Sequence, residues 1–200
     1  MARVIADSKI WVPVHLAIVV GILLMLGGLI ALYHSIRGGL AGALARLGLF
    51  AAVVGVTIGL VLVILDGVAA PQLAQEWAAA APGDQAVALG LVHVNETINV
   101  ALASLFNLVF AGVTFILFGL AVALSDIYPR WLGWVALVAG ASSIVAGLIQ
   151  AFTGEPTDAS RGLTIAGPTV ITLWLLVVGI LLVRKGMGHA TSAQSPGRGS

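Results

Sequence analysis

Five long apolar stretches constrain this chain more than any other feature of its sequence. They cover roughly residues 11–33, 47–67, 98–124, 132–152 and 163–183. A helix rises about 1.5 Å per residue, so about 20 apolar residues cross the hydrocarbon core of a bilayer. Only 8% of the 200 residues are charged, against about 25% in a soluble domain. The sequence therefore predicts an all-α membrane protein, a bundle of about five transmembrane helices.

The connection between the second and third stretches predicts a short helix on the outer side of the membrane. Pro71 is suited to start this Ala-rich helix, and the Pro-Gly pair at 82–83 ends it. Asp84 is suited to cap the helix that follows. Because residues 85–124 contain no proline, we expect a third helix of about 40 residues whose first turns stand above the outer surface.

The distribution of Lys and Arg predicts the orientation of the chain, because these residues concentrate in cytoplasmic segments. With the N-terminus outside, the cytoplasmic segments hold Arg37, Arg46, Arg130, Arg184, Lys185 and Arg198, and the outer segments hold Arg3, Lys9 and Arg161. We therefore expect an outer N-terminus and a cytoplasmic C-terminus, and the Ala/Gly/Val-rich composition favours a bacterial inner membrane. Residues 1–185 form one transmembrane domain, and the Gly/Ser/Pro-rich residues 186–200 are expected to be a disordered cytoplasmic tail.

Glycines at regular spacing indicate where the helices pack. Gly48, Gly55 and Gly59 fall within a narrow arc of the second apolar stretch. The fourth stretch repeats glycine every seventh residue, at 133, 140, 147 and 154. Small residues allow membrane helices to approach closely, so both patterns predict packing seams.

Polar groups within the spans gather near the predicted outer boundary. Ionisable residues are costly inside a membrane, so each is a functional candidate. His15, Asp66, Glu96 with Asn99, and Gln150 come from four different apolar stretches. They are expected to surround one hydrated pocket that opens outward.

A polar stripe on the third helix extends the same pattern inward. Glu96, Asn107 and Thr114 return to within about 20° of one another, with Asn99 and His93 to either side. Such a face should point into the bundle. The predicted ligand-binding residues are His15, Asp66, His93, Glu96, Asn99, Asn107 and Gln150.

Three kinds of chemistry are open to these residues. His15, His93 and Glu96 could ligate a metal ion, since imidazole and carboxylate suit zinc or iron. His15 and His93 could instead be the axial ligands of a haem. Asp66 or Glu96, together with His15, could act as a general acid or base on a lipophilic substrate. A fourth, purely structural explanation, in which these groups are hydrated and bonded to one another, is the one we favour.

Several function classes are excluded or disfavoured. The chain has no cysteine, which removes disulfides, thiol nucleophiles and iron–sulfur clusters, and a net charge of +1 argues against nucleic acid. It contains no metalloprotease, nucleophile-elbow or nucleotide-binding motif. The leading hypothesis is a non-enzymatic bundle that binds a ligand, or a membrane-protein partner, from the outer side. The alternatives are an intramembrane enzyme acting on a lipid or isoprenoid, and a transporter working as a homo-oligomer.

The C-terminal half resembles a known kind of sequence. The run 128–134, Tyr-Pro-Arg-Trp-Leu-Gly-Trp, precedes a glycine-rich helix, and Leu173-Trp174 is followed by a closing Arg184-Lys185 pair. This pattern is similar to that of small uncharacterised bacterial polytopic membrane proteins. The resemblance implies a multi-pass protein of the bacterial inner membrane, and it implies no site residues.

Overall fold

The computed structural model describes residues 2–155 and 157–193. Five helices are long and apolar enough to cross a membrane: Trp11–Ser35, Gly39–Ala79, Gln85–Leu124, Arg130–Thr153 and Ser160–Arg184. The described part of the chain contains no β-strand. The prediction of an all-α membrane bundle with five spans is confirmed.

The second and third spans are each built from three helical segments. The second joins α3 (Gly39–Ile64), the π-helical η1 (Leu65–Ala69) and α4 (Ala70–Ala79), and the third joins α5 (Gln85–Phe106), the π-helical η2 (Asn107–Thr114) and α6 (Phe115–Leu124). The other helices are α1 (Ala2–Asp7), α2 (Trp11–Ser35), α7 (Arg130–Thr153) and α8 (Asp158–Ala193). The short helix predicted between the second and third spans is α4, which runs on from α3 without a break in the chain's helicity. Helix α1 was not predicted.

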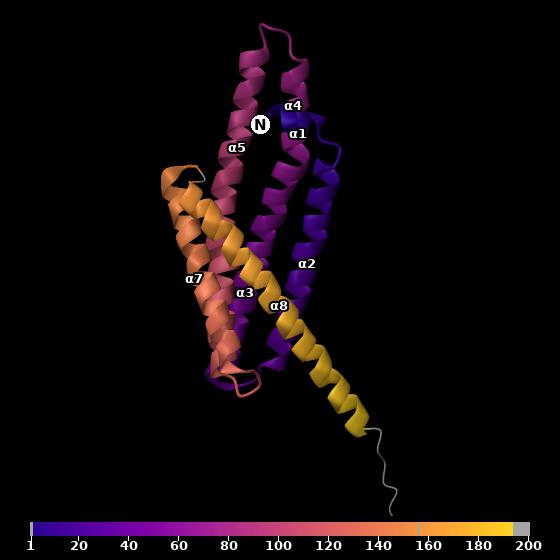
Figure 1. The fold of residues 1–200 in the computed structure, drawn as a ribbon, viewed down its shortest axis with the longest axis vertical. Helices are drawn as coiled ribbons and strands as arrows, with labels where there is room; N and C mark the ends of the chain where they lie inside the picture. The colour runs from indigo at the N-terminus through magenta and orange to yellow at the C-terminus, as the bar shows by residue number, and fades with distance from the viewer. Residues whose placement is uncertain (1, 156, 194–200) are drawn as a thin grey trace, which may run out of the picture.

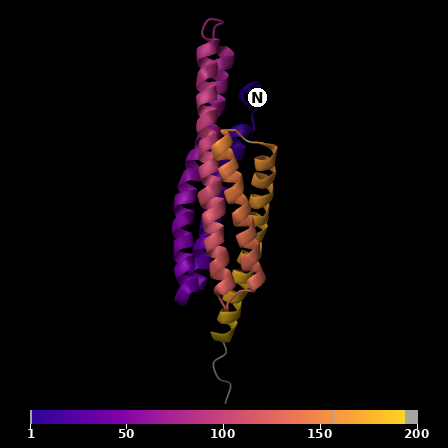
Figure 2. The same ribbon diagram turned by 90° about the vertical axis from the view of Figure 1, so that its left-hand side faces the viewer.

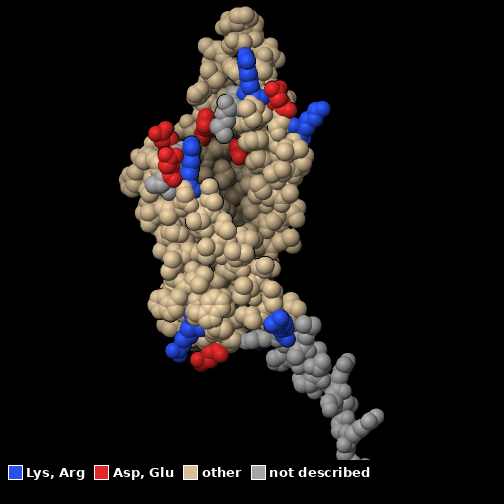
Figure 3. Space-filling model, in the orientation of Figure 1, with Lys and Arg blue, Asp and Glu red and all other residues tan. Residues whose placement is uncertain are grey.

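Two features shape the bundle. Helices α4 and α5 form a hairpin that projects beyond the other helices, and α1 lies against its base (Figures 1 and 2). We call this the hairpin end. Helix α8 crosses the face of the bundle obliquely (Figure 1). Charged side chains lie at two levels near the ends of the molecule, with a broad uncharged band between them (Figure 3), as expected for a protein that crosses a bilayer.

The long third span has the predicted extent, from Gln85 to Leu124, 40 residues. Asp84 occupies the N-cap position as expected, but its side chain makes no capping hydrogen bond. Helix α8 is described as far as Ala193, beyond the point where the sequence predicts the tail to begin. Residues 194–200 of that predicted tail lie outside the described residues.

The glycine seams hold the second, third and fourth spans together. A Cβ atom added to Gly55 would lie 2.6 Å from Cβ of Phe110, and one added to Gly140 would lie 2.9 Å from the backbone oxygen of Gly112. Gly147 approaches the backbone of Ser104 in the same way, at 2.8 Å. These distances are too short for any side chain, so the helices meet at their backbones, as the glycine spacing predicts. Gly154 is different, because it ends α7 in the left-handed conformation at φ 71°.

The two π-helical segments have no counterpart in the sequence predictions. Pro71 follows η1 and lacks the N–H that would bond to the carbonyl of Gly67, which favours a widened turn at that point. In η2 the Thr114 hydroxyl donates to the carbonyl of Val109, five residues earlier, at 3.0 Å. Widened turns of this kind are frequent at functional sites. Asp66 lies in the first of them, and Asn107 begins the second.

Candidate functional site

A histidine–aspartate pair joins the first two spans at the hairpin end. His15 Nε2 lies 3.0 Å from Asp66 Oδ2, and the indole N–H of Trp11 donates to the backbone oxygen of Asp66 at 2.8 Å. The rings of Trp11 and His15 stack with centroids 5.0 Å apart. Gly67 permits this contact, because a Cβ at that position would collide with the His15 side chain. The widened turn η1 and its glycine therefore place a carboxylate against an imidazole.

The surroundings of His15 define where its protons lie. Its Nδ1 is 2.8 Å from the backbone oxygen of Trp11, which can only accept, so we assign a proton to Nδ1. Its Nε2 faces a carboxylate oxygen, and a hydrogen bond between these atoms needs one proton. That proton belongs either to an imidazolium beside a carboxylate or to a carboxylic acid beside a neutral imidazole. In both forms the pair holds one proton between two heavy atoms 3.0 Å apart.

Helix α5 faces this pair with three polar side chains on neighbouring turns. Asn95 is only 8% exposed, and no described residue forms a hydrogen bond with its side chain. Asn99 has a buried Oδ1 that also finds no partner among the described residues. Glu96 lies between them and is exposed. A buried acceptor without a partner costs about 1–3 kcal/mol, so Asn99 Oδ1 is available to a hydrogen-bond donor from outside the protein.

The inner end of the site is closed by a second polar contact. The Asn107 amide donates to Gln150 Oε1 at 2.9 Å and to the Thr164 hydroxyl at 3.3 Å, which ties together η2, α7 and α8. Because Gln150 accepts through its oxygen, its own NH₂ group is left as a donor. Gln150 is buried, at 6% exposure, and lines the space that the other groups surround.

These residues enclose a cavity of about 400 Å³, which we call the polar cavity. Its polar lining is His15, Asp66, Asn95, Glu96, Asn99 and Gln150, with Trp11 at one edge. Its remaining lining is apolar, and no Lys or Arg is among the described residues that form it. Figure 3 shows the bundle hollowed on its side in the half nearer the hairpin end, with both acidic and basic side chains near the opening.

The structure brings together most of the residues that the sequence singled out. His15, Asp66, Glu96, Asn99 and Gln150 all line the polar cavity. The two remaining residues do not: Asn107 lies behind Gln150, and His93 is exposed and outside the lining. Sequence reasoning missed Asn95, although it is four residues before Asn99 and therefore on the same helix face.

The predicted metal ligand set is not assembled in the part of the chain that the structure describes. Within the described residues no group of three or more His, Cys, Asp or Glu side chains could hold a metal ion. His93 does not share the cavity with His15, and both ring nitrogens of His15 already have partners. The side chains of His15, His93 and Glu96 are therefore not brought together as a metal site among the described residues, and the haem ligation stays a prediction.

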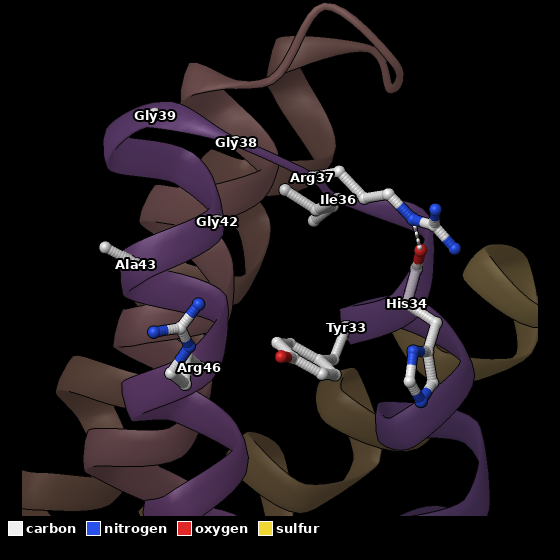
Figure 4. A pocket seen from close by; sticks show the side chains of 9 residues that line it. All are labelled: Tyr33, His34, Ile36, Arg37, Gly38, Gly39, Gly42, Ala43 and Arg46. Atoms are coloured by element: carbon white, nitrogen blue, oxygen red, sulfur yellow. Dashed lines mark hydrogen bonds between the residues drawn. The ribbon is translucent and has the colours of Figure 1, made fainter.

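A second cavity, about 420 Å³, lies at the opposite end of the bundle, around the turn between α2 and α3. We call it the basic cavity, because Arg37 and Arg46 line it together with Tyr33 and His34. Figure 4 shows Tyr33 and Arg46 on either side of the space, and the Arg37 Nε–H donating to the His34 backbone oxygen at 3.2 Å. Gly38 and Gly39, both at positive φ, make the turn itself.

The fold and the polar cavity define a class: a polytopic helical membrane protein with a partly polar pocket between its spans. Within this class, the chain belongs to the family described as a domain of unknown function, DUF4386, whose model matches residues 2–184. The predicted resemblance to an uncharacterised family is thus confirmed, and the match reaches well beyond the C-terminal half. Comparison with curated proteins and with solved structures gave no match.

Proposed function

We propose that the protein binds, in the polar cavity, a lipophilic molecule whose polar group is neutral or cationic. The observation that carries this proposal is the buried Oδ1 of Asn99, which finds no partner among the described residues, next to Asn95, a buried residue whose side chain makes no hydrogen bond to them either. A hydroxyl or amino group on a ligand would supply the missing hydrogen bonds. The cavity volume of about 400 Å³ lies in the usual range for ligand pockets, about 300–1,000 Å³.

The charge of the cavity favours this class of polar group. Asp66 and Glu96 bring two carboxyl groups to the lining; His15 pairs with Asp66, and no Lys or Arg is among the described lining residues. An anionic group would be repelled and would find no guanidinium or ammonium to bind. A neutral polyol or an amine meets only acceptors and amides.

We further propose that the hairpin end faces the outside of a bacterial inner membrane. The support is the excess of Lys and Arg in the segments that this orientation assigns to the cytoplasm. The polar cavity would then take its ligand from the outer leaflet or the outer space.

The proposal is tested with three amphiphiles that share one chain and differ in the polar group. Monododecanoylglycerol is neutral, dodecylamine is cationic and dodecyl phosphate is anionic. In a neutral detergent, the first two should raise the melting temperature of the purified protein, by about the same amount for each tenfold increase in concentration above Kd, and the phosphate should not. In Asn99→Leu and in Asn95→Leu, at least ten times more ligand should be needed to raise the melting temperature by the same amount.

The matched control for these variants is Thr57→Val. Thr57 is exposed and its hydroxyl bonds only to its own helix, at the Val53 oxygen. It should leave the ligand response unchanged. Equal stabilisation by dodecyl phosphate, or an unchanged response in both Asn variants, would disprove the proposal.

A second candidate function is acid–base catalysis on the same ligand, favoured by the shared proton between His15 and Asp66. This pair could move one proton to or from a bound group, with Glu96 as a further carboxylate at the cavity wall. Catalysis predicts that a lipid extract incubated with the protein changes in mass spectra and that His15→Gln abolishes the change. Binding without catalysis predicts that the mass spectra of the lipid extract stay the same with the wild type and with His15→Gln.

A further inference from the structure

A third cavity adjoins the polar cavity on the side facing the middle of the bundle. It has a volume of about 290 Å³, and we call it the apolar cavity. Ile18, Leu62 and Val63 line both cavities, so the two spaces adjoin at these three side chains. Ile171 on α8 closes the apolar cavity on the other side.

The apolar cavity offers nothing to a polar group. Apart from Thr172, the described residues that line it are apolar, and they include Met25 and Phe106. The Thr172 hydroxyl is already bonded to the Pro168 oxygen of its own helix at 2.8 Å. A lining of this kind favours hydrocarbon over polar groups.

Helix α8 contributes to the lining of only one of the two cavities. Helix α8 crosses the face of the bundle (Figure 1) and covers the apolar cavity with Pro168 and Ile171. It does not contribute to the lining of the polar cavity, where the molecule is hollowed at its side (Figure 3). The opening lies between apolar helix faces, with Ile18 of α2 42% exposed, so it faces the bilayer and not only the aqueous phase.

We infer that the ligand is an amphiphile with one flexible apolar chain, whose polar group occupies the polar cavity and whose chain lies in the apolar cavity. The inference rests on the proposed function and adds the chain, its location and its route from the bilayer past α2. A volume of about 290 Å³ is that of about ten molecules of liquid water, at ~30 Å³ each, and so suits a single chain rather than two.

The inference is tested by filling the apolar cavity. Ile171→Trp places a large ring in it, whereas Leu173→Trp places the same ring two residues away on the 57% exposed face of α8. Binding of monododecanoylglycerol should weaken at least tenfold in Ile171→Trp and remain unchanged in Leu173→Trp. The same variants test the proposed function independently. If binding is lost in Ile171→Trp but unchanged in Asn95→Leu and Asn99→Leu, the polar cavity does not bind the polar group and the proposed function is wrong. The reverse pattern would overturn the chain's place in the apolar cavity and leave the proposed function standing.

A second measurement keeps the test decisive should Ile171→Trp fail to fold. Wild-type protein is photolysed with monododecanoylglycerol that carries a diazirine at the end of its chain, and the labelled residues are mapped by mass spectrometry. Labels should concentrate on the apolar cavity, at Met25, Phe106 and Ile171, and should be displaced by unlabelled monododecanoylglycerol. Labels spread evenly over the outward faces of all five spans, or unaffected by the competitor, would overturn the inference.

Discussion

The polar cavity and the basic cavity have almost the same volume, about 400 and 420 Å³, and opposite chemistry. The basic cavity lies where the positive-inside pattern places arginines in any case, and the Arg37 side chain there reaches its own turn at the His34 oxygen. The polar cavity holds the buried Asn99 Oδ1, which has no partner among the described residues, and an imidazole–carboxylate pair between two spans. Volume therefore does not distinguish the two cavities, whereas the hydrogen bond left unmade by a buried group does.

The largest expected effect concerns which of the two cavities faces outward. The native chain has no cysteine, so single cysteines can be placed at Ser8, near the polar cavity, and at Asp126, beside the basic one. In intact cells an impermeant maleimide should label Ser8→Cys fully and Asp126→Cys only after permeabilisation. The opposite pattern would assign the polar cavity to the cytoplasmic side and refute the orientation.

The next effect tests whether both cavities depend on one packed frame. Gly55→Leu and Gly140→Leu insert side chains where backbones touch, and should destabilise the bundle by about 1–3 kcal/mol or more. Thermal unfolding in detergent measures this. Gly90→Leu is the control, because a Cβ at Gly90 meets nothing within 4 Å. Unaltered melting of both seam variants would show that the close contacts are not sustained in the protein.

A smaller change separates the two cavities directly. Gly67→Ala pushes the His15 side chain away from Asp66 and should cost about 1–3 kcal/mol while weakening ligand binding. Gly42→Ala, in the lining of the basic cavity, brings its Cβ only to 3.5 Å from the Arg37 backbone, an ordinary contact. Its effect should stay within about 0.5 kcal/mol. If Gly67→Ala and Gly42→Ala lose the same stability, the two cavities do not differ in how well they tolerate an added Cβ.

The smallest effect depends on pH and lies at the end of the molecule that holds the basic cavity. Tyr128 follows the third span, and its hydroxyl lies 2.7 Å from Ser35 Oγ. Burial raises the pKa of Tyr128 above its ordinary value of 10.0, although the Ser35 bond acts against this. As the pH rises, the Tyr128 hydroxyl therefore loses its proton in the unfolded chain before it does so in the folded one. The contribution of Tyr128 to folding stability is complete below about pH 10 and is lost as the pH rises further.

Melting temperatures between pH 8 and 11 test this point. Tyr128→Phe should lower stability by about 0.5–1.5 kcal/mol at pH 8 through the lost hydrogen bond, and should remove the Tyr128 part of the alkaline decline. Ser35→Ala should lose the same bond yet keep the decline. A decline of the same size in Tyr128→Phe would show that another group causes it.

The sequence predicted the spans and their seams for a simple physical reason. The bilayer sets the length of an apolar stretch, and glycines lie where helix backbones meet. Both features can therefore be predicted from the residue types alone. The site followed in part, because ionisable groups such as His15 and Asp66 are rare enough in a span to stand out.

What the sequence could not provide is the facing of each helix. In lipid the outward faces are as apolar as the inward ones, so periodicity did not separate His93, which lies outside the polar cavity, from Asn95, which lines it. The π-helical segments also escaped prediction, because a change in the hydrogen-bonding step of a helix needs no change in its apolar pattern. The oblique path of α8 depends on contacts between distant residues and has no local signal.

In the π-helical segment η2, the number of residues matters as much as their identity. The glycine seams contact η2 itself, at Phe110 and Gly112, and α5 beyond it is the upper half of the third span, which carries Asn95 and Asn99. Each residue turns a helix by about 100°, so removing a single residue from Asn107–Thr114 would rotate that upper half away from the cavity it lines. Substitutions in η2 can be conservative, but insertions and deletions cannot. The chemistry of the polar cavity is thus fixed by a count of residues in a segment that lies outside it.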